Sequence, residues 1–174
     1  MPVWEFKGRK AKIDPTAFIA PNATVIGDVE IGGGSSLWPS AVVRGDYNPV
    51  RIGRRVNIQD NATVHATPAG PCTIGDSVSV GHNAVVHRCT VGNNVIIGMG
   101  AIVLDGSKIG DWVIVGAGAV VTPNSEIPPK SMVLGIPAKV VGKLREGHLD
   151  QIRMNADGYA DLAQMYRAQA AKLK

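Results

Sequence analysis

Three of the four histidines in this chain, His65, His82 and His87, lie within a stretch of 23 residues. Neutral imidazole is the commonest protein ligand for zinc, and a catalytic zinc site uses three protein ligands while a fourth position stays open. The clustering therefore predicts a metal site, with Zn²⁺ as the first candidate. Fe²⁺ and Co²⁺ are also possible, because three imidazoles bind all of these ions. The alternative is that the three are surface histidines that hydrogen-bond to one another.

A six-residue repeat fixes where these histidines lie in space. Ile, Val or Leu opens each of twenty hexapeptide units, at positions 13, 19, 25, 31, 37, 43, 52, 58, 64, 74, 80, 86, 91, 97, 103, 109, 115, 121, 127 and 133. Such a fixed period predicts an all-β solenoid of stacked parallel coils, in which three units make one triangular coil. Equivalent positions of successive coils then lie about 4.8 Å apart.

The register of the repeat separates the histidines into two columns. Arg44, His65 and His87 each follow the first residue of units that are three apart, so they form one outward column. His82 lies one face earlier in the coil, in a column with Asp60. One chain cannot easily bring all three histidines together. A cyclic homotrimer, in which His82 comes from the neighbouring chain, would create one site at each of three interfaces.

Further polar residues surround the histidine column. Arg44 and Asp46 are spaced for a bidentate ion pair that orients a loop or bridges two chains. Asn57 and Gln59 could direct amide hydrogens at an oxyanion or at a metal-bound water. They could equally form one of the Asn and Gln ladders found in stacked β-structures, and both interpretations stay open.

The rest of the chain divides into a cap, the solenoid and a tail. We expect an N-terminal cap hairpin over residues 1–12, the solenoid over 13–138 and a C-terminal helical segment over 139–174. Apolar spacing in the tail predicts either one helix that is broken near Asp157-Gly158 or two helices packed on the solenoid. Three extra residues within 43–51 and four within 64–73 predict loops beside the histidine column.

Composition excludes several classes of protein. The formal net charge is +4, but much of the basic charge lies after Ala138, and aromatic residues do not alternate with Lys or Arg. We therefore expect no nucleic-acid binding. Residues 1–10 lack the apolar core of a signal peptide and no stretch is long enough to cross a bilayer, which favours a soluble, cytoplasmic protein without membrane contact. Cys72 and Cys89 are expected as buried free thiols on adjacent coils.

Three motifs resemble the γ-class carbonic anhydrase family: VVRGD at 42–46, NIQDNATVH at 57–65 and GHNAVVH at 81–87. The resemblance implies a left-handed β-helix and a homotrimer that binds zinc through His65 and His87 of one chain and His82 of the next. It also implies that metal-activated hydroxide attacks CO₂ to give bicarbonate. The resemblance further implies that Arg44 and Asp46 pair across the interface. Gln59, Asn57 and Tyr159 would orient the hydroxide or the substrate, and Asp60 would support the metal ligands.

The two loops beside the histidines depart from the family pattern. The best-characterised archaeal members carry proton-shuttling glutamates there, whereas this chain has GDYNPV and ATPAGPC. The sequence therefore predicts that hydration is slow, buffer-dependent or absent. Two other functions stay open, namely an acyl-CoA thioesterase or acyltransferase-like enzyme that uses the same interfacial pocket, and a metal-binding trimer that is not an enzyme.

Overall fold

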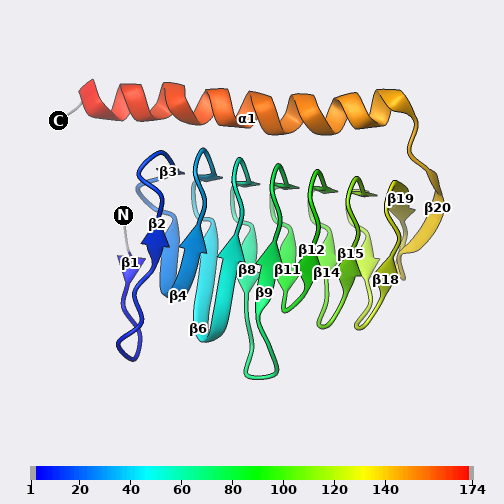
Figure 1. Ribbon diagram of the computed structural model, residues 1–174, viewed down its shortest axis with the longest axis horizontal. Coiled ribbons are helices and arrows are strands. Elements are labelled where there is room, and N and C mark those ends of the chain that lie inside the picture. The colour runs from blue at the N-terminus through cyan, green and yellow to red at the C-terminus, as the bar shows by residue number, and fades with distance from the viewer. Residues whose placement is uncertain (1–2, 173–174) are drawn as a thin grey trace.

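The computed structural model describes residues 3–172 and confirms the predicted β-solenoid, with one long helix lying along it (Figure 1). One face is a parallel ladder of β1 (Val3–Trp4), β4 (Thr24–Ile31), β6 (Val42–Ile52), β8 (Thr63–His65), β11 (Val85–His87), β14 (Ile102–Val103) and β17 (Val120–Val121). The long strands β4 and β6 turn the corner and continue into a second face with β2 (Lys12–Ile13), β9 (Cys72–Ile74), β12 (Thr90–Val91), β15 (Lys108–Ile109) and β18 (Glu126–Ile127).

The third face is a separate sheet of eight strands. In stacking order its parallel strands are β3 (Phe18–Ile19), β5 (Ser36–Leu37), β7 (Asn57–Ile58), β10 (Ser79–Val80), β13 (Ile96–Ile97), β16 (Ile114–Val115) and β19 (Ser131–Leu134). The final strand, β20 (Lys139–Lys143), pairs with β19 in the antiparallel direction. The helix α1 (Glu146–Lys172) then runs back over this face toward the N-terminal coils (Figure 1).

The repeat folds in this way because most of the hexapeptide units open on a buried β-branched residue. Val25, Val43, Val64, Val86 and Val103 are all fully buried and stack one above another. β-Branched side chains fit such a pleated, packed surface well. Cys72 and Cys89 lie in the same interior as buried free thiols, as predicted.

The N-terminal segment differs from the expected cap hairpin. Phe6 and Arg9 do form an antiparallel bridge around a turn at Lys7-Gly8. However, β1 and β2 both pair with β4 in the parallel direction. The segment is thus the first coil of the solenoid with a protruding turn, and it occupies the exposed edge that β4 would otherwise present.

The C-terminal segment also differs from the prediction in two respects. Residues 139–143 form strand β20 instead of the start of a helix, because Gly135 adopts a positive φ of 98° and the chain turns back against β19. The prediction of a helical segment from residue 139 is therefore wrong for this stretch, whose Val140 and Val141 are β-branched residues that favour strands. The predicted break near Asp157-Gly158 is wrong, since α1 continues through it.

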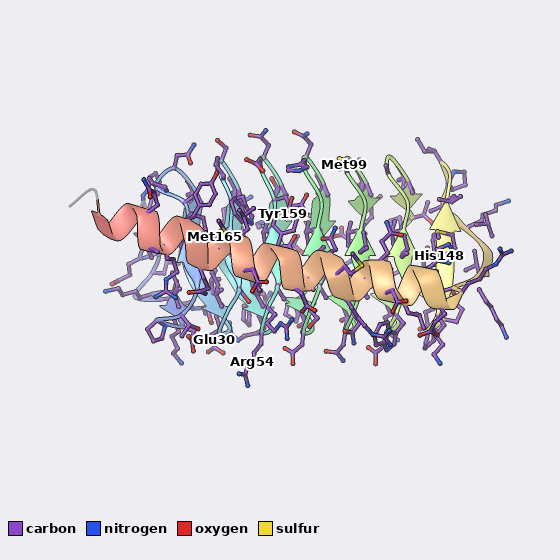
Figure 2. All side chains as sticks on the ribbon, turned by 90° about the horizontal axis from the view of Figure 1, so that it is seen from above. Glu30, Arg54, Met99, His148, Tyr159 and Met165 are labelled. Atoms are coloured by element: carbon purple, nitrogen blue, oxygen red, sulfur yellow. The ribbon has the colours of Figure 1, made fainter. Side chains whose placement is uncertain are left out.

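Packing against the solenoid explains why α1 tolerates Gly158, which costs a helix about 1 kcal/mol relative to alanine. Ile152, Ala156 and Ala163 are buried against the third face. The tail residues Leu162 and Met165, which were expected in the apolar stripe, are instead 37% and 68% exposed. The buried side of α1 carries the small residues Ala156 and Ala163 instead, and the helix runs along the length of the solenoid (Figure 2).

Aromatic and ionic contacts fix the position of α1. The Tyr159 and Tyr166 rings pack edge-on against Trp38, with ring centroids 5.4 and 5.2 Å away. Arg167 donates to the carbonyl oxygen of Thr16 at 2.6 Å, and Arg55 pairs with Asp157. Within residues 3–172, no helix combines the length and apolarity that a membrane crossing needs.

The two insertions behave differently from each other. The extra residues around Asp46–Pro49 stay within β6, where the register with β4 shifts after Gly45, so they form a bulge and not the predicted loop. Residues 66–71 do leave the coil, as a tight turn closed by a bridge between Thr67 and Gly70. The Asn48 amide donates to the Thr67 carbonyl at 2.8 Å and ties the two insertions together.

Candidate functional site

The predicted column of Arg44, His65 and His87 is present on the first face. The backbone register pairs His65 with Arg44 on one side and with His87 on the other. The His65 Nδ1 and His87 Nε2 atoms lie 3.2 Å apart. The six-residue repeat therefore brings two of the three candidate ligands to adjacent coils, with ring nitrogens facing each other.

An ion pair supports His65. Its Nε2 lies 3.2 Å from Asp46 Oδ1, and Asp46 Oδ2 accepts from the Arg44 guanidinium. Burial raises the pKa of Asp46, but the hydrogen bonds from Arg44 and His65 outweigh it, and that pKa lies below its ordinary value. Burial, and secondarily the Arg44 charge, lowers the pKa of His65 despite the Asp46 hydrogen bond. Asp46 therefore stays ionised and His65 favours the neutral form.

His87 has an equivalent support that the sequence reasoning missed. Its Nδ1 lies 2.6 Å from Asp105 Oδ1. The same Asp105 oxygen lies 3.4 Å from Arg88 Nε. The register contained the signal: Val86 pairs with Val103, so Asp105 falls on the next coil beside the residues that follow Val86.

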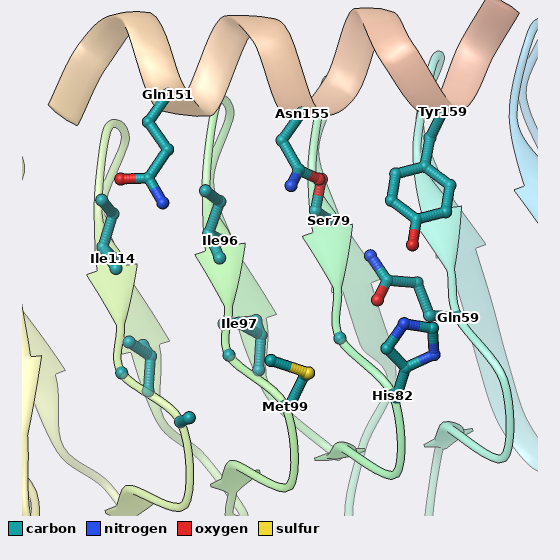
Figure 3. Close-up of a pocket in the computed structure, with 15 residues that line it drawn as sticks. Gln59, Ser79, His82, Ile96, Ile97, Met99, Ile114, Gln151, Asn155 and Tyr159 are labelled. Atoms are coloured by element: carbon teal, nitrogen blue, oxygen red, sulfur yellow. The ribbon is translucent and has the colours of Figure 1, made fainter. Parts of the chain in front are cut away.

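His82 lies apart from this column, as the register predicted. Its Nδ1 is 2.9 Å from Asp60 Oδ2, and the backbone of the next coil donates to its carbonyl at 2.8 Å. Figure 3 shows the His82 ring beneath Gln59 on the face that α1 covers. Among residues 3–172 of a single chain, no three His, Cys, Asp or Glu side chains are grouped to hold a metal ion.

The facing nitrogens of His65 and His87 fit a cation. Each imidazole directs its other nitrogen at a carboxylate, and binding of a cation between the rings requires the tautomers that donate the N–H to Asp46 and Asp105. Both facing nitrogens are then acceptors 3.2 Å apart. Two nitrogens bound to one tetrahedral zinc at about 2.0–2.1 Å lie about 3.3 Å apart, which matches this pair. Metal-bound histidines usually hydrogen-bond a carboxylate in this way.

Asn57, Gln59 and Tyr159 lie on the third face, near His82. Asn57 is buried, donates to Ser79 Oγ at 2.8 Å and accepts from Gln59 Nε2 at 2.9 Å. Asn57 thus holds the Gln59 amide in place from a buried position. Tyr159 points from α1 toward Gln59 (Figure 3), and burial, with a smaller effect of the Asp60 charge, raises its pKa.

Comparison with known proteins places the chain among hexapeptide-repeat proteins. Residues 88–123 match the family model "Bacterial transferase hexapeptide (six repeats)". The chain is 44% identical to a carbonic anhydrase of Geobacillus kaustophilus, and the alignment covers 95% of this chain and 91% of that protein. It is 49% identical to a probable carbonic anhydrase of Methanocaldococcus jannaschii, over 84% and 92% respectively.

Other relatives carry different lengths or names. The mitochondrial gamma carbonic anhydrase 1 of Arabidopsis thaliana is 45% identical over 92% of this chain, which spans 60% of that relative's length. The carnitine operon protein CaiE of Escherichia coli is 33% identical over 93% of this chain and 83% of its own length. A solved Bacillus cereus structure, described as a candidate acetyltransferase, superposes with a TM-score of 0.94 at 39% identity, over 96% and 97% of the two chains.

The two prokaryotic carbonic anhydrases match this chain over nearly their full length, and the motifs around the three histidines lie within the paired coils. On this similarity, the chain belongs to the γ-class carbonic anhydrase-like family of hexapeptide-repeat proteins.

Proposed function

We propose that this protein is a carbonic anhydrase-like metalloenzyme that hydrates CO₂ reversibly to bicarbonate, with one divalent metal ion at each interface of a homotrimer. The observation that supports it most directly is the pair of facing imidazole nitrogens, 3.2 Å apart, whose rings are both oriented by carboxylates. The sequence identities of 44% to a carbonic anhydrase and 49% to a probable carbonic anhydrase, over 91% and 92% of their lengths, give independent support.

In this proposal His65 and His87 of one chain and His82 of its neighbour hold Zn²⁺, or Fe²⁺ or Co²⁺ in its place. A third ligand from the neighbour is consistent with the lack, among residues 3–172 of one chain, of a three-ligand group. The Nδ1 of His82 is engaged by Asp60, which leaves its Nε2 for the metal. When bound, the ion supplies Lewis acidity that lowers the pKa of water from 15.7 to about 7.

The protein's own residues would then position the reactants. Gln59, held by Asn57, presents its amide oxygen beside His82, where it can orient a water or a bicarbonate hydroxyl. Tyr159 is half-buried with a raised pKa, so it stays protonated and can donate a hydrogen bond. Arg44 lies beside the ligand carboxylate Asp46 and keeps it ionised.

The proton released by hydration has no carboxylate carrier in the 66–71 turn, whose residues are Ala, Thr, Pro, Ala, Gly and Pro. Export of the proton would therefore depend on buffer molecules that reach the interface. This predicts a rate that rises with buffer concentration.

A second candidate function is acyl transfer or thioester hydrolysis in the same pocket. Two observations favour it, namely the similarity to the Bacillus cereus protein described as a candidate acetyltransferase and a groove beside His82 that is far larger than CO₂. A metal-binding trimer without catalysis is the third outcome that an experiment must separate.

The test is the CO₂ hydration rate of the zinc-loaded protein beside His65→Ala and His148→Ala variants. His148 is the fourth histidine and lies at the start of α1, far along the chain from the column. The proposal expects activity that His65→Ala abolishes and His148→Ala keeps. Metal bound through His65 without any hydration above the variant would refute the anhydrase proposal and favour the other two functions.

A further inference from the structure

A groove runs between α1 and the third face, and one end of it is formed by His82 and Gln59. It has a volume of about 360 Å³ and crosses the coils of β7, β10, β13 and β16 (Figure 3). Four successive coils span about 14 Å at one strand spacing each. This volume falls within the range of pockets that bind organic ligands. A three-atom substrate such as CO₂ would leave most of the groove unused.

The groove changes character along its length. Near His82 it is lined by polar groups, those of Gln59, Ser79 and Tyr159. Farther along the solenoid axis it is lined by Ile96 and Ile114 on the side of the sheet and by the Gln151 side chain on the side of α1. Figure 3 shows these two isoleucines on successive strands beyond the polar end. A ligand that fills the groove therefore has a polar head at His82 and an apolar tail over the isoleucines.

Between the two ends lies an acceptor without a partner. Asn155 projects from α1 into the groove, one helical turn from Tyr159 (Figure 3). Its Oδ1 atom is buried and has no hydrogen-bond partner among the described residues. Buried polar atoms nearly always have a hydrogen-bond partner in native proteins, so an unpaired acceptor of this kind indicates that a ligand or a water molecule binds to it. The atom is an acceptor, so the missing group is an N–H or O–H donor.

We propose that this groove, lined by Gln59, His82, Ile96, Ile114 and Asn155, binds an unbranched aliphatic compound that carries an amide or hydroxyl donor next to its polar head. The head lies at His82, the donor bonds to Asn155 Oδ1 and the tail covers the isoleucines. The tail region spans about two coil spacings, roughly 10 Å, which accommodates a chain of roughly eight carbons. The site and its ligand class rest on the groove alone and do not depend on the proposed hydration of CO₂.

The experiment titrates the trimer with N-alkylacetamides that have two to eight carbons in the alkyl chain. These probes carry an N–H and a tail but no metal-binding head. Burial of each methylene is expected to tighten binding about threefold to fourfold, up to the length at which the groove is full. Calorimetry gives the dissociation constants. The proposal would be overturned if the two-carbon and eight-carbon probes bound with equal affinity. It would also be overturned if neither bound, which is the result expected if a neighbouring subunit fills the groove.

Two variants separate the donor contact from the tail contact. Wild type should prefer N-octylacetamide to N-octyl-N-methylacetamide by about tenfold, because only the former can donate to Asn155, and a hydrogen bond is worth about 0.5–1.5 kcal/mol. Asn155→Leu should erase that preference. Ile96→Trp should remove the gain with chain length, while Met154→Trp, on the exposed side of α1 at 73% exposure, should not. The assignment would be contradicted if Asn155→Leu kept the preference for the N–H probe and Ile96→Trp kept the gain with chain length.

The groove and the proposed function fail separately. Zinc content and the unfolding midpoint, measured on the same samples, show whether each variant is folded and whether the metal site is intact. Chain-length-dependent binding to a protein that holds no metal would support the groove and refute the proposed metalloenzyme. A metal-loaded, active trimer with no chain-length dependence would do the reverse.

Discussion

Asp105 provides a sharp test of the metal site, because it was found from the geometry and not from a sequence motif. Its carboxylate lies 2.6 Å from His87 Nδ1 and turns Nε2 of that ring toward His65. Replacing a carboxylate that orients a metal-bound histidine typically weakens metal binding 10–100-fold. Asp105→Asn is therefore expected to raise the zinc dissociation constant by that factor, equivalent to about 1.4–2.7 kcal/mol.

The assay is zinc competition against a chelating dye, together with the visible spectrum of the Co²⁺-loaded protein. The matched control is Asp28→Asn, because the Asp28 carboxylate pairs with Arg51 and not with a histidine, and its side chain is 30% exposed, against 37% for Asp105. Asp28→Asn should leave both readouts unchanged. If Asp105→Asn bound zinc as tightly as wild type, or if both variants weakened it equally, Asp105 would not position His87.

Three further predictions follow from the site and the helix. Raising the buffer concentration at constant pH and ionic strength should raise the CO₂ hydration rate until it saturates, and a rate that is independent of buffer would mean that the protein carries its own proton route. The raised pKa of Tyr159 means that the folded protein favours the neutral phenol, so the contribution of Tyr159 to stability should be fully present below pH 10 and be lost as the pH rises through the folded pKa. In denaturant titrations, Tyr159→Phe should reduce this loss of stability at alkaline pH. An unchanged dependence of stability on pH would contradict the assignment. Ile152 lies on the buried side of α1, so Ile152→Ala should lower the free energy of unfolding in urea by about 2–5 kcal/mol. Met154→Ala, on the exposed side, should lower it little. Equal losses would mean that α1 does not pack on the solenoid as described.

The repeat made most of the fold predictable. A six-residue period with one buried apolar residue per unit leaves little freedom, so the column of Arg44, His65 and His87 and the separation of His82 followed from counting alone. Register converts sequence position into spatial position wherever every coil has the same length.

The same reasoning failed where the period ends. Residues 139–143 were included in the helical segment, but pairing with β19 decides their conformation, and the sequence does not show that this strand edge is free. Gly158 indicated a break in the tail, yet burial of the flanking alanines holds α1 together. Tertiary packing overrode local propensity in both cases.

The placement of the candidate ligands and of Asp46 and Asp60 beside them was predictable from the sequence, whereas Asp105 was missed. Asp105 lies two residues after Val103, which pairs with Val86, so the register places it near His87, but no sequence motif marked it as a support. Asn57 is buried and accepts a hydrogen bond from Gln59, and its role in the chemistry stays a prediction. The roles of the three histidines as ligands stay a prediction.

The central claim, that each metal site is shared by two chains, is tested most directly by counting metal in mixed trimers. His82→Ala and His87→Ala chains are each expected to bind no zinc alone. Co-refolding them in equal amounts should restore about one quarter of the wild-type zinc, because a cyclic trimer that contains both variants has one interface at which an intact His65–His87 pair meets an intact His82. Mixing His65→Ala with His87→Ala should restore none, since both lesions lie in the same half of the site. Equal recovery in both mixtures, or none in either, would contradict the shared site.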